Sequence, residues 1–449
     1  MFKKTSHRKH RAWILTVDMG YGHQRAAYPL KHLSQNGIIT ANNYPGIPRK
    51  DRKIWEGSRE FYEFISRFKK IPIIGEKAFE VFDKLQRIPQ FYPKRDLSRS
   101  IFQVNRFYDL FEKMDWGKHL IDKLAKNPVP IITSFFTTAM MADYYQYPGE
   151  IYCLATDTDI SRSWVTPEPK KSKIIYLAPT KRVKERLQLY GVRPSKIYLT
   201  GFPLPEINVG KNLKILRHDL GRRLIQLDPG KVFLNQYERT LGRHIGWQYI
   251  RKRPVRPLTI TFCVGGAGAQ REIGAEIIRS LSGEIKMGKI KVNLVAGTHH
   301  AAAKFFKDSV KLCGLSKELG KSVNILYNKD KYGYFNEFDK MLRITDVLWT
   351  KPSELSFYCA LGLPIIMAPP IGSQEFYNRD WLQAIGAGIN QLDPRYVNEW
   401  LADWLKSGWL AEAAMEGFME APRFGTYNVD KIVFHQYKEA KKIRTVLQY

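Results

Sequence analysis

Short apolar runs rich in β-branched residues alternate with helical patterns along the first half of the chain. Residues 13–18 have the pattern of a buried strand, residues 19–22 that of a tight turn, and residues 23–34 that of a helix. A further amphipathic helix is predicted at residues 180–190. Additional strands are predicted at residues 130–134, 151–156, 174–177 and 197–200. Strands that alternate with helices favour a parallel sheet covered by helices.

The second half of the chain repeats this order. Residues 258–263 predict a strand, residues 264–268 a glycine turn, and residues 269–281 a helix. Later strands are predicted at residues 292–295, 323–327, 347–349 and 365–368. Because both halves open with strand, glycine turn and helix, the pattern predicts two doubly wound α/β domains that face one another.

Residues 55–114 break this rhythm and leave two interpretations open. Phe61, Phe64 and Phe68 recur at helical spacing, and a second helical pattern covers residues 76–87. These aromatic residues either pack inward in a helical subdomain or form an interfacial element. In the second case the aromatic rings enter lipid and the neighbouring lysines and arginines contact head groups.

Residues 206–257 show no strand pattern, and basic residues outnumber acidic ones. Residues 251–257 combine prolines with repelling charges and are typical of an extended linker. We therefore predict a basic insert and linker here, which separates two domains. The predicted organisation is an N-terminal domain at 1–205, the insert at 206–257, a C-terminal domain at 258–427, and a terminal helix at 428–449 that packs back on the first domain.

Length, charge and cysteine content set further limits. A chain of 449 residues is too long for one ordinary core, so two domains are expected. The 72 basic and 43 acidic residues give a net charge of +29, which favours nucleic acid, an anionic membrane or phosphorylated ligands as partners, or serves solubility alone. No apolar stretch suits a membrane-spanning helix, and no signal peptide is apparent. The four cysteines have neither metal nor redox spacing and indicate buried, reduced thiols in a cytoplasmic protein.

The glycine turn of the second half is a candidate phosphate site. It has the sequence Gly265-Gly266-Ala267-Gly268 and lies between a strand and a helix. Glycine lets the backbone approach a diphosphate, and a helix N-terminus offers N–H groups and partial positive charge. The alternative is a turn that serves tight packing alone. The turn lacks the lysine of an ATP-hydrolysing P-loop.

A second candidate site lies further along the same half. A strand ends near Thr350, Ser353 is the expected N-cap of the following helix, and a Gly-Leu-Pro sequence at 362–364 leads into the next strand. Ligands of parallel sheets collect at the carboxyl ends of strands, where the side chains of Ser353, Glu354, Gln374 and Asn378 are expected to converge.

At these motifs the sequence resembles GT-B glycosyltransferases of the group that includes monogalactosyldiacylglycerol synthases and the GlcNAc transferase that completes lipid II. The similarity rests on Asp18-Met-Gly-Tyr-Gly-His23, Thr156-Asp157 with Trp164, and the segment 189–203 in the first half. In the second half it rests on the turn at Gly265, on the Gly-Leu-Pro block, and on Gln374-Glu-x-x-Asn378. The resemblance implies two Rossmann-like doubly wound domains in a GT-B arrangement, with the acceptor on the N-terminal side and the nucleotide-sugar on the C-terminal side.

The resemblance also implies an activity and its residues. The expected reaction is an inverting, metal-independent transfer of a hexose from a nucleotide-diphosphate sugar, with UDP as the expected nucleotide, to a lipid or other amphiphile. His23 is the expected general base, because histidine ordinarily titrates near neutral pH, and Asp157 is grouped with it as catalytic. The expected acceptor-side residues are Gly20, Gly22 and Trp164. The expected donor-binding residues are Gly265, Gly266, Gly268, Ala269, Thr298, Pro352, Ser353, Glu354, Gln374, Glu375 and Asn378.

The sequence departs from the group at two positions. Phe357 replaces the usual ribose-binding glutamate, and Glu354, one helical turn earlier, is its expected substitute. Arg162 and Ser163 precede Trp164 where the synthases carry a histidine, so the acceptor chemistry is expected to differ.

Metal and cofactor are not expected. Asp157-Thr-Asp159 matches a metal-binding motif of the other glycosyltransferase fold, but it lies in the acceptor half and follows the Thr-Asp pattern instead. The adjacent His299 and His300 point apart at a helix start and do not form a metal pair.

Three functions are compatible with the sequence. The leading one is glycosyl transfer to a lipid by a cytoplasmic protein that is peripherally associated with the inner face of an anionic membrane. A sugar-nucleotide epimerase of the same fold is the nearest alternative. A non-catalytic binder of nucleic acid or anionic membrane on a decayed transferase scaffold is the third, although nucleic acid is not the expected partner.

Overall fold

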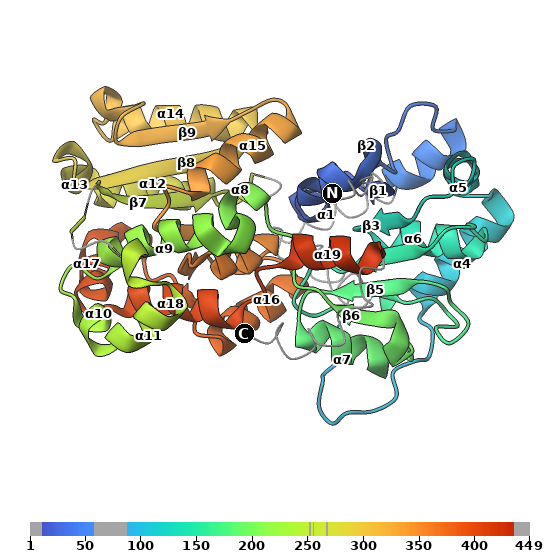
Figure 1. Ribbon diagram of the computed structural model, residues 1–449. Helices are drawn as coiled ribbons and strands as arrows, with labels where there is room; N and C mark the ends of the chain where they lie inside the picture. The colour runs from blue at the N-terminus through green and yellow to red at the C-terminus, as the bar shows by residue number, and fades with distance from the viewer. Residues whose placement is uncertain (1–10, 58–87, 251–252, 255, 266–267, 435–449) are drawn as a thin grey trace, which may run out of the picture. The chain divides into compact units, whose positions relative to one another are not determined.

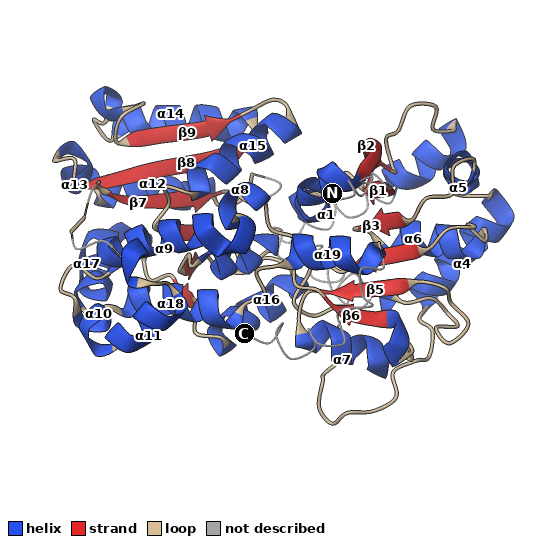
Figure 2. Cartoon of the chain, viewed as in Figure 1, coloured by secondary structure: helices blue, strands red, loops and turns tan. Residues whose placement is uncertain are grey.

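The computed structural model describes residues 11–57, 88–250, 253–254, 256–265 and 268–434. The chain divides into two compact units (Figure 1). Unit 1 contains residues Met1–Pro203 and Phe424–Tyr449, and unit 2 contains Leu204–Arg423. Each unit is built around one β-sheet with helices on its faces (Figure 2).

The sheet of unit 1 has six parallel strands in the order β2-β1-β3-β4-β5-β6. Its strands are β1 (Ala12–Thr16), β2 (Ser34–Thr40), β3 (Ile131–Thr133), β4 (Ile151–Leu154), β5 (Ile175–Ala178) and β6 (Ile197–Leu199). The predicted strands are confirmed, and β2 is an addition. The helix predicted at 23–34 is instead α1 (Tyr21–Ala27) followed by a 3-10 helix, η1 (Tyr28–Leu33), because Pro29 stands at the start of the second segment.

The strand order determines where unit 1 can bind a ligand. Strand β1 pairs with β2 on one side and with β3 on the other, so the chain reverses its direction of winding between β1 and β3. In such sheets a crevice forms at the carboxyl ends of the two strands that flank the reversal. The turn that leads to His23 follows β1, and Ser134 follows β3 directly.

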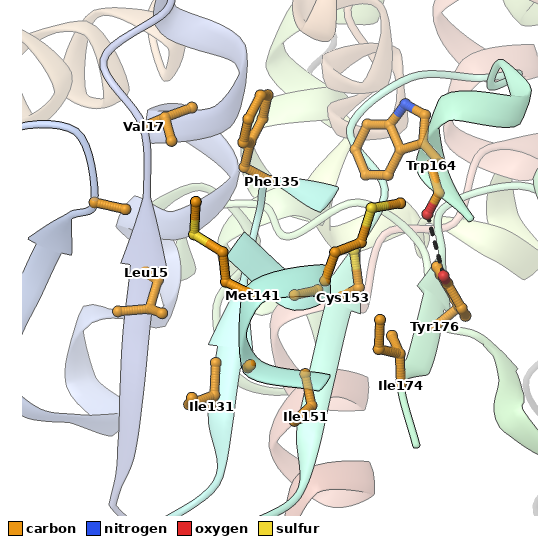
Figure 3. Close-up of a cluster of buried hydrophobic side chains, with 14 of the residues drawn as sticks. Leu15, Val17, Ile131, Phe135, Met141, Ile151, Cys153, Trp164, Ile174 and Tyr176 are labelled. Carbon is orange, nitrogen blue, oxygen red and sulfur yellow. Dashed lines mark hydrogen bonds between the residues drawn. The ribbon is translucent and has the colours of Figure 1, made fainter. Parts of the chain in front are cut away.

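Apolar residues from neighbouring strands form the core of unit 1. Leu15, Ile131, Ile151 and Cys153 lie side by side beneath Met141 of helix α6 (Figure 3). Among the described residues of this unit, helices and turns include α4 (Phe102–Met114), α5 (Lys118–Ala125), α6 (Phe136–Tyr144), η2 (Arg162–Trp164), α7 (Lys181–Leu189), η3 (Pro194–Lys196) and α19 (Gly425–Val433). Helix α7 is the helix predicted at 180–190, and the Thr180 side chain caps it by accepting from the N–H of Val183 at 3.1 Å.

The described part of the region 55–114 contains both buried and exposed aromatic residues, and Tyr92 and Phe102 are 66% and 76% exposed. Trp55, Phe111 and Trp116 are buried, and their rings contact one another. The candidate interfacial residues Phe61, Phe64 and Phe68 lie outside the described residues.

Helix α19 belongs to unit 1, and its first residue lies against the end of that unit's last loop. A Cβ at Gly425 would lie 2.1 Å from the Phe202 carbonyl oxygen, so the close approach requires glycine. The side-chain amide of Asn428 donates to the Thr200 carbonyl at 2.8 Å. The helix begins at Gly425 rather than at 428, and residues 435–449 of the predicted terminal helix lie outside the described residues.

The sheet of unit 2 has six parallel strands in the order β12-β11-β10-β7-β8-β9. Its strands are β7 (Leu258–Cys263), β8 (Ile290–Gly297), β9 (Val323–Tyr327), β10 (Val347–Thr350), β11 (Ile365–Met367) and β12 (Gly388–Asn390). Here the reversal of winding lies between β7 and β10. The predicted fold class of two Rossmann-like doubly wound domains is confirmed.

Several helices and turns cover the sheet of unit 2. They are α12 (Arg271–Ser280), α13 (Ser282–Lys286), α14 (His300–Leu312), η6 (Ser316–Glu318), α15 (Lys331–Leu342), η7 (Glu354–Leu361), α16 (Ser373–Ala384), η8 (Pro394–Tyr396), α17 (Val397–Lys406) and α18 (Trp409–Glu420). Cys263 and Cys359 of this unit are buried, as is Cys153 of unit 1. Cys313 is only half-buried, so it differs from the expected buried thiol.

The segment 206–257, expected as an insert and linker, forms helices of unit 2. They are α8 (Glu206–Val209), η4 (Lys211–Leu213), α9 (Lys214–Leu227), α10 (Val232–Gln236), α11 (Glu238–His244) and η5 (Trp247–Tyr249). Helix α9 packs against the Gly-Leu-Pro turn, where a Cβ at Gly362 would lie 2.6 Å from Leu220. The contact division places the boundary after Pro203. The difference arises because several charges of the segment are buried and bonded, whereas the sequence suggests that they repel one another in solvent.

Arg223 of α9 shows how a buried charge holds this layer in place. Its guanidinium donates to the carbonyl oxygens of Thr345 at 2.8 Å, Leu361 at 2.7 Å and Gly362 at 3.0 Å. Burial lowers the pKa of Arg223 to about 10. At the end of the same segment, Arg256 forms a bidentate ion pair with the buried Asp346 at 2.6 Å. Both arginines tie the expected linker to the sheet of unit 2.

Candidate functional site

His23 lies at the winding reversal of unit 1. Strand β1 ends at Thr16, and Gly20, with φ of 96°, starts helix α1 in a conformation that suits glycine. The Nδ1 atom of His23 lies 2.7 Å from the carbonyl oxygen of Ser134, which follows β3. A carbonyl only accepts, so Nδ1 carries the proton in this contact. In the neutral imidazole Nε2 is then the basic nitrogen.

Residues that follow two strands, β3 and β4, surround the His23 ring. Phe135, after β3, contacts the ring edge-to-face with centroids 4.9 Å apart, and the Trp164 ring lies 6.3 Å away. The hydroxyl of Thr156, after β4, lies 3.4 Å from Nδ1. Phe135 and Trp164 extend from the same side of the core cluster (Figure 3). The structure thus brings together the predicted residues His23 and Trp164, with the half-buried Asp157 next to Thr156 in the chain.

Trp164 is held in place through its own backbone. Its carbonyl accepts from the Tyr176 hydroxyl at 3.1 Å (Figure 3), and its side chain is buried. The neighbouring Arg162, which stands where the synthases carry a histidine, is buried and donates to the carbonyls of Ser98 at 2.8 Å and Thr166 at 2.9 Å. Burial lowers the pKa of Arg162. Arg162 therefore binds backbone carbonyls and joins two loops.

The carboxylate of Asp159 forms an ion pair inside unit 1. Both of its oxygens accept from the buried guanidinium of Arg186, at 2.8 and 2.7 Å. Within the described ranges, no cluster of three or more His, Cys, Asp or Glu side chains has the placement of a metal site.

The predicted diphosphate turn lies at the end of β7. The Gly265 N–H donates to the Ala269 carbonyl at 3.3 Å, and the Gly268 N–H donates to the Gly265 carbonyl at 2.7 Å. Gly268 has φ of 71°, which suits glycine. Gly266 lies outside the described residues. The described ends of the turn therefore form a compact loop that leads into helix α12.

Lys351 lies against this turn, and the sequence pattern does not single it out. A Cβ at Gly265 would lie 2.8 Å from the Lys351 side chain, so glycine gives the lysine room to cross the turn. The Lys351 ammonium forms an ion pair with Glu375, whose other oxygen accepts from the Ile371 N–H at 2.7 Å. The sequence signal that could have identified Lys351 is its position directly after the buried strand β10, which pairs with β7 where the winding reverses.

The other predicted donor-binding residues support the loop that carries Lys351. The Asn378 side chain is buried, and its amide donates to the Pro352 carbonyl at 3.3 Å. The Ser353 side chain accepts from the Leu355 N–H at 3.5 Å, which confirms the predicted N-cap. Two side chains of α16 thus bind this loop, because Glu375 pairs with Lys351 and Asn378 donates to the neighbouring Pro352. Gln374 is half-buried on the same helix.

Phe357 packs into the core rather than toward solvent. It is 3% exposed, and its ring lies 5.5 Å from that of Trp381. Glu354 lies three residues earlier in the 3-10 helix η7, a spacing that aligns side chains along one face. Glu354 is half-buried, so the two residues stand in different surroundings.

The end of β8 completes this edge of the sheet. Thr298 follows the strand and is half-buried, and a Cβ at Gly268 would lie 3.6 Å from the His299 ring. The His300 ring instead lies 5.7 Å from that of Tyr327. The carboxyl ends of β7, β8 and β10 therefore bring a glycine turn, a histidine and a paired lysine to one place in unit 2.

Comparison with known proteins places the chain near glycosyltransferases. A family model described as a domain of unknown function (DUF6938) matches residues 247–320 and 314–430. The processive diacylglycerol beta-glucosyltransferase of Bacillus subtilis strain 168 is 23% identical over 388 residues, which cover 84% of this chain and 82% of that protein. The protein of the same name from Bacillus cereus strain G9842 is 22% identical over 448 residues, 96% of this chain and 95% of that protein.

Solved structures give more distant similarity. MurG of Acinetobacter baumannii has a TM-score of 0.43 and 12% identity, over 95% of this chain and 99% of that one. The UDP-GlcNAc 2-epimerase of Neisseria meningitidis, solved with UDP-GlcNAc, has a TM-score of 0.45 and 10% identity over the same shares. The sequence relatives, which span most of the chain, confirm the resemblance to GT-B glycosyltransferases that the motifs predict.

Proposed function

We propose that this protein is a hexosyltransferase that moves a sugar from a nucleotide-diphosphate donor, a UDP-sugar, to a lipid or amphiphilic acceptor. Inversion at the sugar carbon and independence from metal are parts of the proposal. The observation that carries it is the orientation of His23, whose Nδ1–H donates to Ser134 and leaves Nε2 as the basic nitrogen. A histidine in this state suits the removal of a proton from an acceptor hydroxyl.

The acceptor step is assigned to unit 1. His23 Nε2 takes the proton of the acceptor hydroxyl while that oxygen forms a bond to the anomeric carbon of the sugar. The Ser134 carbonyl stabilises the resulting imidazolium, because it accepts from the opposite ring nitrogen. Asp157 is assigned to the same step from its position beside Thr156, which lies 3.4 Å from Nδ1. Gly20 and Gly22 shape the turn that presents the histidine.

The donor step is assigned to unit 2. The bond between the anomeric carbon and the diphosphate oxygen breaks, and its electrons leave with the diphosphate. Groups that are already in place stabilise this charge without rearranging. The turn at Gly265–Ala269 is assigned to the diphosphate, and Lys351, which crosses it, is proposed to supply positive charge beside it. Thr298, Glu354 and Gln374 are proposed to contact the sugar or the nucleoside.

The lipid acceptor is proposed from two considerations. The relatives that span most of the chain are named for glucosyl transfer to diacylglycerol. A net charge of +29 also suits adsorption to an anionic membrane surface. Among the described residues, no helix is long and apolar enough to cross a bilayer. We therefore propose a cytoplasmic protein that reaches its acceptor by peripheral contact with the inner membrane face.

A transfer assay tests this proposal. Purified protein is incubated with radiolabelled UDP-glucose and with diacylglycerol in mixed detergent micelles, and the lipid fraction is analysed for product. Binding of UDP is measured separately by thermal shift, since a ligand that binds the folded state stabilises it by a free energy that rises with the logarithm of its concentration over Kd. Labelled glycolipid and stabilisation by UDP are expected. A protein that no nucleoside diphosphate stabilises, and that labels no lipid, would not be a transferase of this kind.

A further inference from the structure

Helices α10 and α11 and the 3-10 helix η5 expose three large apolar side chains within twenty residues. Between residues 231 and 250, the buried side chains are Phe233, Leu241 and Ile245. Val232, Tyr237 and Trp247 are 47%, 38% and 53% exposed. Large apolar residues that gather at a surface often mark a site of interaction.

The end of α17 and the start of α18 extend this surface. A Cβ at Gly408 would lie 3.0 Å from Phe233 of α10, so the two segments pack directly against each other. Trp409, next in the chain, is 44% exposed. In the ribbon view α10 and α11 lie beside α17 and α18 at one end of unit 2 (Figure 1).

Packing holds the exposed rings in fixed positions. The Trp247 ring lies over α11 at Gly242, where a Cβ would meet its nitrogen at 2.4 Å. The Tyr237 ring lies 4.8 Å from Phe233, and the Trp409 ring lies 5.3 Å from Trp404. Because the rings are already ordered, little side-chain entropy is lost when a partner covers them.

The exposed charge of residues 231–250 is positive, because Lys231, Arg239 and Arg243 are exposed there and the exposed acid is Glu238. On α17 and α18 the exposed Lys406 is accompanied by the exposed acids Asp403 and Glu412. Asp228, nearby in the chain, is buried and accepts from the N–H groups of Val232 and Leu234 at 2.9 and 2.8 Å. The carboxylate of Asp228 is therefore hydrogen-bonded inside unit 2.

We propose that this surface docks unit 2 on an anionic lipid bilayer. The α10–α11 surface consists of Lys231, Val232, Tyr237, Arg239, Arg243, Trp247, Lys406 and Trp409. Tryptophan and tyrosine favour the head-group layer, where the ring meets apolar chains and the N–H or O–H meets water. The cations contact lipid phosphates.

The choice of lipid over nucleic acid rests on the proposed function, because a lipid acceptor requires contact with a membrane. Nucleic acid shares the preference for cations and aromatic rings. An aliphatic side chain such as Val232 is stabilised more by burial in lipid than by contact with nucleic acid. The surface shares no residue with the interfacial stretch predicted within 55–114, so it gives unit 2 a membrane contact of its own.

Co-sedimentation with vesicles tests the proposal. The full-length protein is mixed with vesicles of phosphatidylcholine alone or with about one-third phosphatidylglycerol, at low salt and at about 0.5 M NaCl. Binding that requires the anionic lipid and falls with salt is expected, because exposed charges are screened. Lys231→Gln, Arg239→Gln and Arg243→Gln together should weaken binding about a hundredfold, since each cation contributes about fivefold. Tyr237→Ala, Trp247→Ala and Trp409→Ala together should weaken it by a similar factor.

Matched substitutions at the far side of the unit serve as controls. Leu312, at the end of α14, is 85% exposed, and Lys311, Lys317 and Lys321 are exposed nearby. Leu312→Ala, and the three lysines changed together to Gln, should bind vesicles as the parent protein does. Far-UV circular dichroism and UDP binding confirm that every variant is folded.

Three outcomes would overturn the proposal: equal binding to neutral and anionic vesicles, no binding at low salt, and full binding by both triple variants. Single-stranded RNA bound by the parent protein and lost by the triple variants, without vesicle binding, would assign the surface to nucleic acid. Transfer to diacylglycerol in micelles distinguishes this failure from failure of the proposed function, because micelles present the acceptor without an anionic bilayer.

Discussion

The Nδ1 atom of His23 lies 2.7 Å from the carbonyl oxygen of Ser134, a residue 111 positions later in the chain. The contact joins helix α1, which follows β1, to the loop after β3, and the winding of unit 1 reverses between these two strands. It fixes both the direction of the ring and the nitrogen that carries the proton. A backbone carbonyl fulfils this role whatever side chain stands at position 134, so the orientation does not depend on a carboxylate partner.

Replacement of His23 should affect turnover rather than donor binding. We expect His23→Ala to lower kcat by about a hundredfold or more, the usual contribution of a general base, with the Kd for UDP unchanged. Steady-state transfer assays and calorimetric titration with UDP measure the two effects. His32→Ala is the matched control, because the exposed His32 ring also contacts a carbonyl, that of Pro29 at 3.0 Å, away from the strand ends. Equal loss of turnover in both variants would contradict the assignment.

Lys351 should contribute to the binding of the diphosphate. We expect Lys351→Met to weaken UDP by about 1–3 kcal/mol and to leave uridine, which lacks phosphate, within a few tenths, because a charge-assisted hydrogen bond is lost. Gly265→Val should act in the same direction, since its side chain would collide with Lys351. Competition binding with UDP and uridine measures both. Lys340→Met, an exposed lysine at the end of α15, is the control, and equal weakening of UDP and uridine by Lys351→Met would remove Lys351 from the site.

Transfer should proceed without a divalent cation. The carboxylate of Asp159 is bonded to Arg186, which is why Asp157-Thr-Asp159 is not expected to hold a metal. We expect the rate of transfer to be unchanged by EDTA and by added Mg²⁺ or Mn²⁺. A strict requirement for either ion, measured after dialysis against EDTA, would return Asp157 to consideration as a metal ligand.

Most of the fold could be predicted because buried parallel strands have a strong local pattern. The runs at β1, β3, β7 and β10 are almost wholly apolar, so the turns and helices that follow them can also be located in the sequence. The edge strands β2 and β12 are not predicted, because β2 begins with polar residues and contains Gly37, and β12 has only three residues. The other two edge strands, β6 and β9, have β-branched and apolar residues and are predicted.

The helices of 206–257 escape prediction for another reason. The charge of Arg223 suggests a solvated segment, whereas in the structure it is buried and donates to backbone carbonyls of distant loops. Partners that lie more than a hundred residues away leave no local signal. The same holds for the site. His23 could be chosen from its turn, but its contact with Ser134 depends on the order of the strands, and Lys351 meets Gly265 only because β10 pairs with β7.

Arg223 should be important for the stability of unit 2. We expect Arg223→Met to lower the free energy of unfolding by about 2–4 kcal/mol, because buried carbonyls lose their donors while the cost of burying a charge is recovered. Urea unfolding followed by circular dichroism measures the change. Arg239→Met, an exposed arginine of the same segment, should change stability by less than about 0.5 kcal/mol. If the two variants were equally stable, the guanidinium of Arg223 would not be what holds α9 to the sheet.

Stability should fall on mild acidification, and His244 should account for part of the fall. Burial, followed by the nearby charges of Arg243, Arg423 and Arg217, lowers the pKa of His244 in the folded protein. The unfolded chain therefore binds a proton at His244 at a higher pH than the folded chain does. As the pH falls through the ordinary histidine pKa of about 6.5, the unfolded state gains that proton first, and the folded state loses stability until its own lower pKa is reached. Above this window His244 is neutral in both states and has no such effect.

We expect His244→Gln to reduce the fall in Tm between pH 7.5 and pH 5 without raising Tm at pH 7.5 by the same amount. Differential scanning fluorimetry at several pH values, with His32→Gln as a control, measures the difference. A parallel pair of Tm curves for the parent protein and His244→Gln would mean that the arginines around His244 do not oppose its protonation.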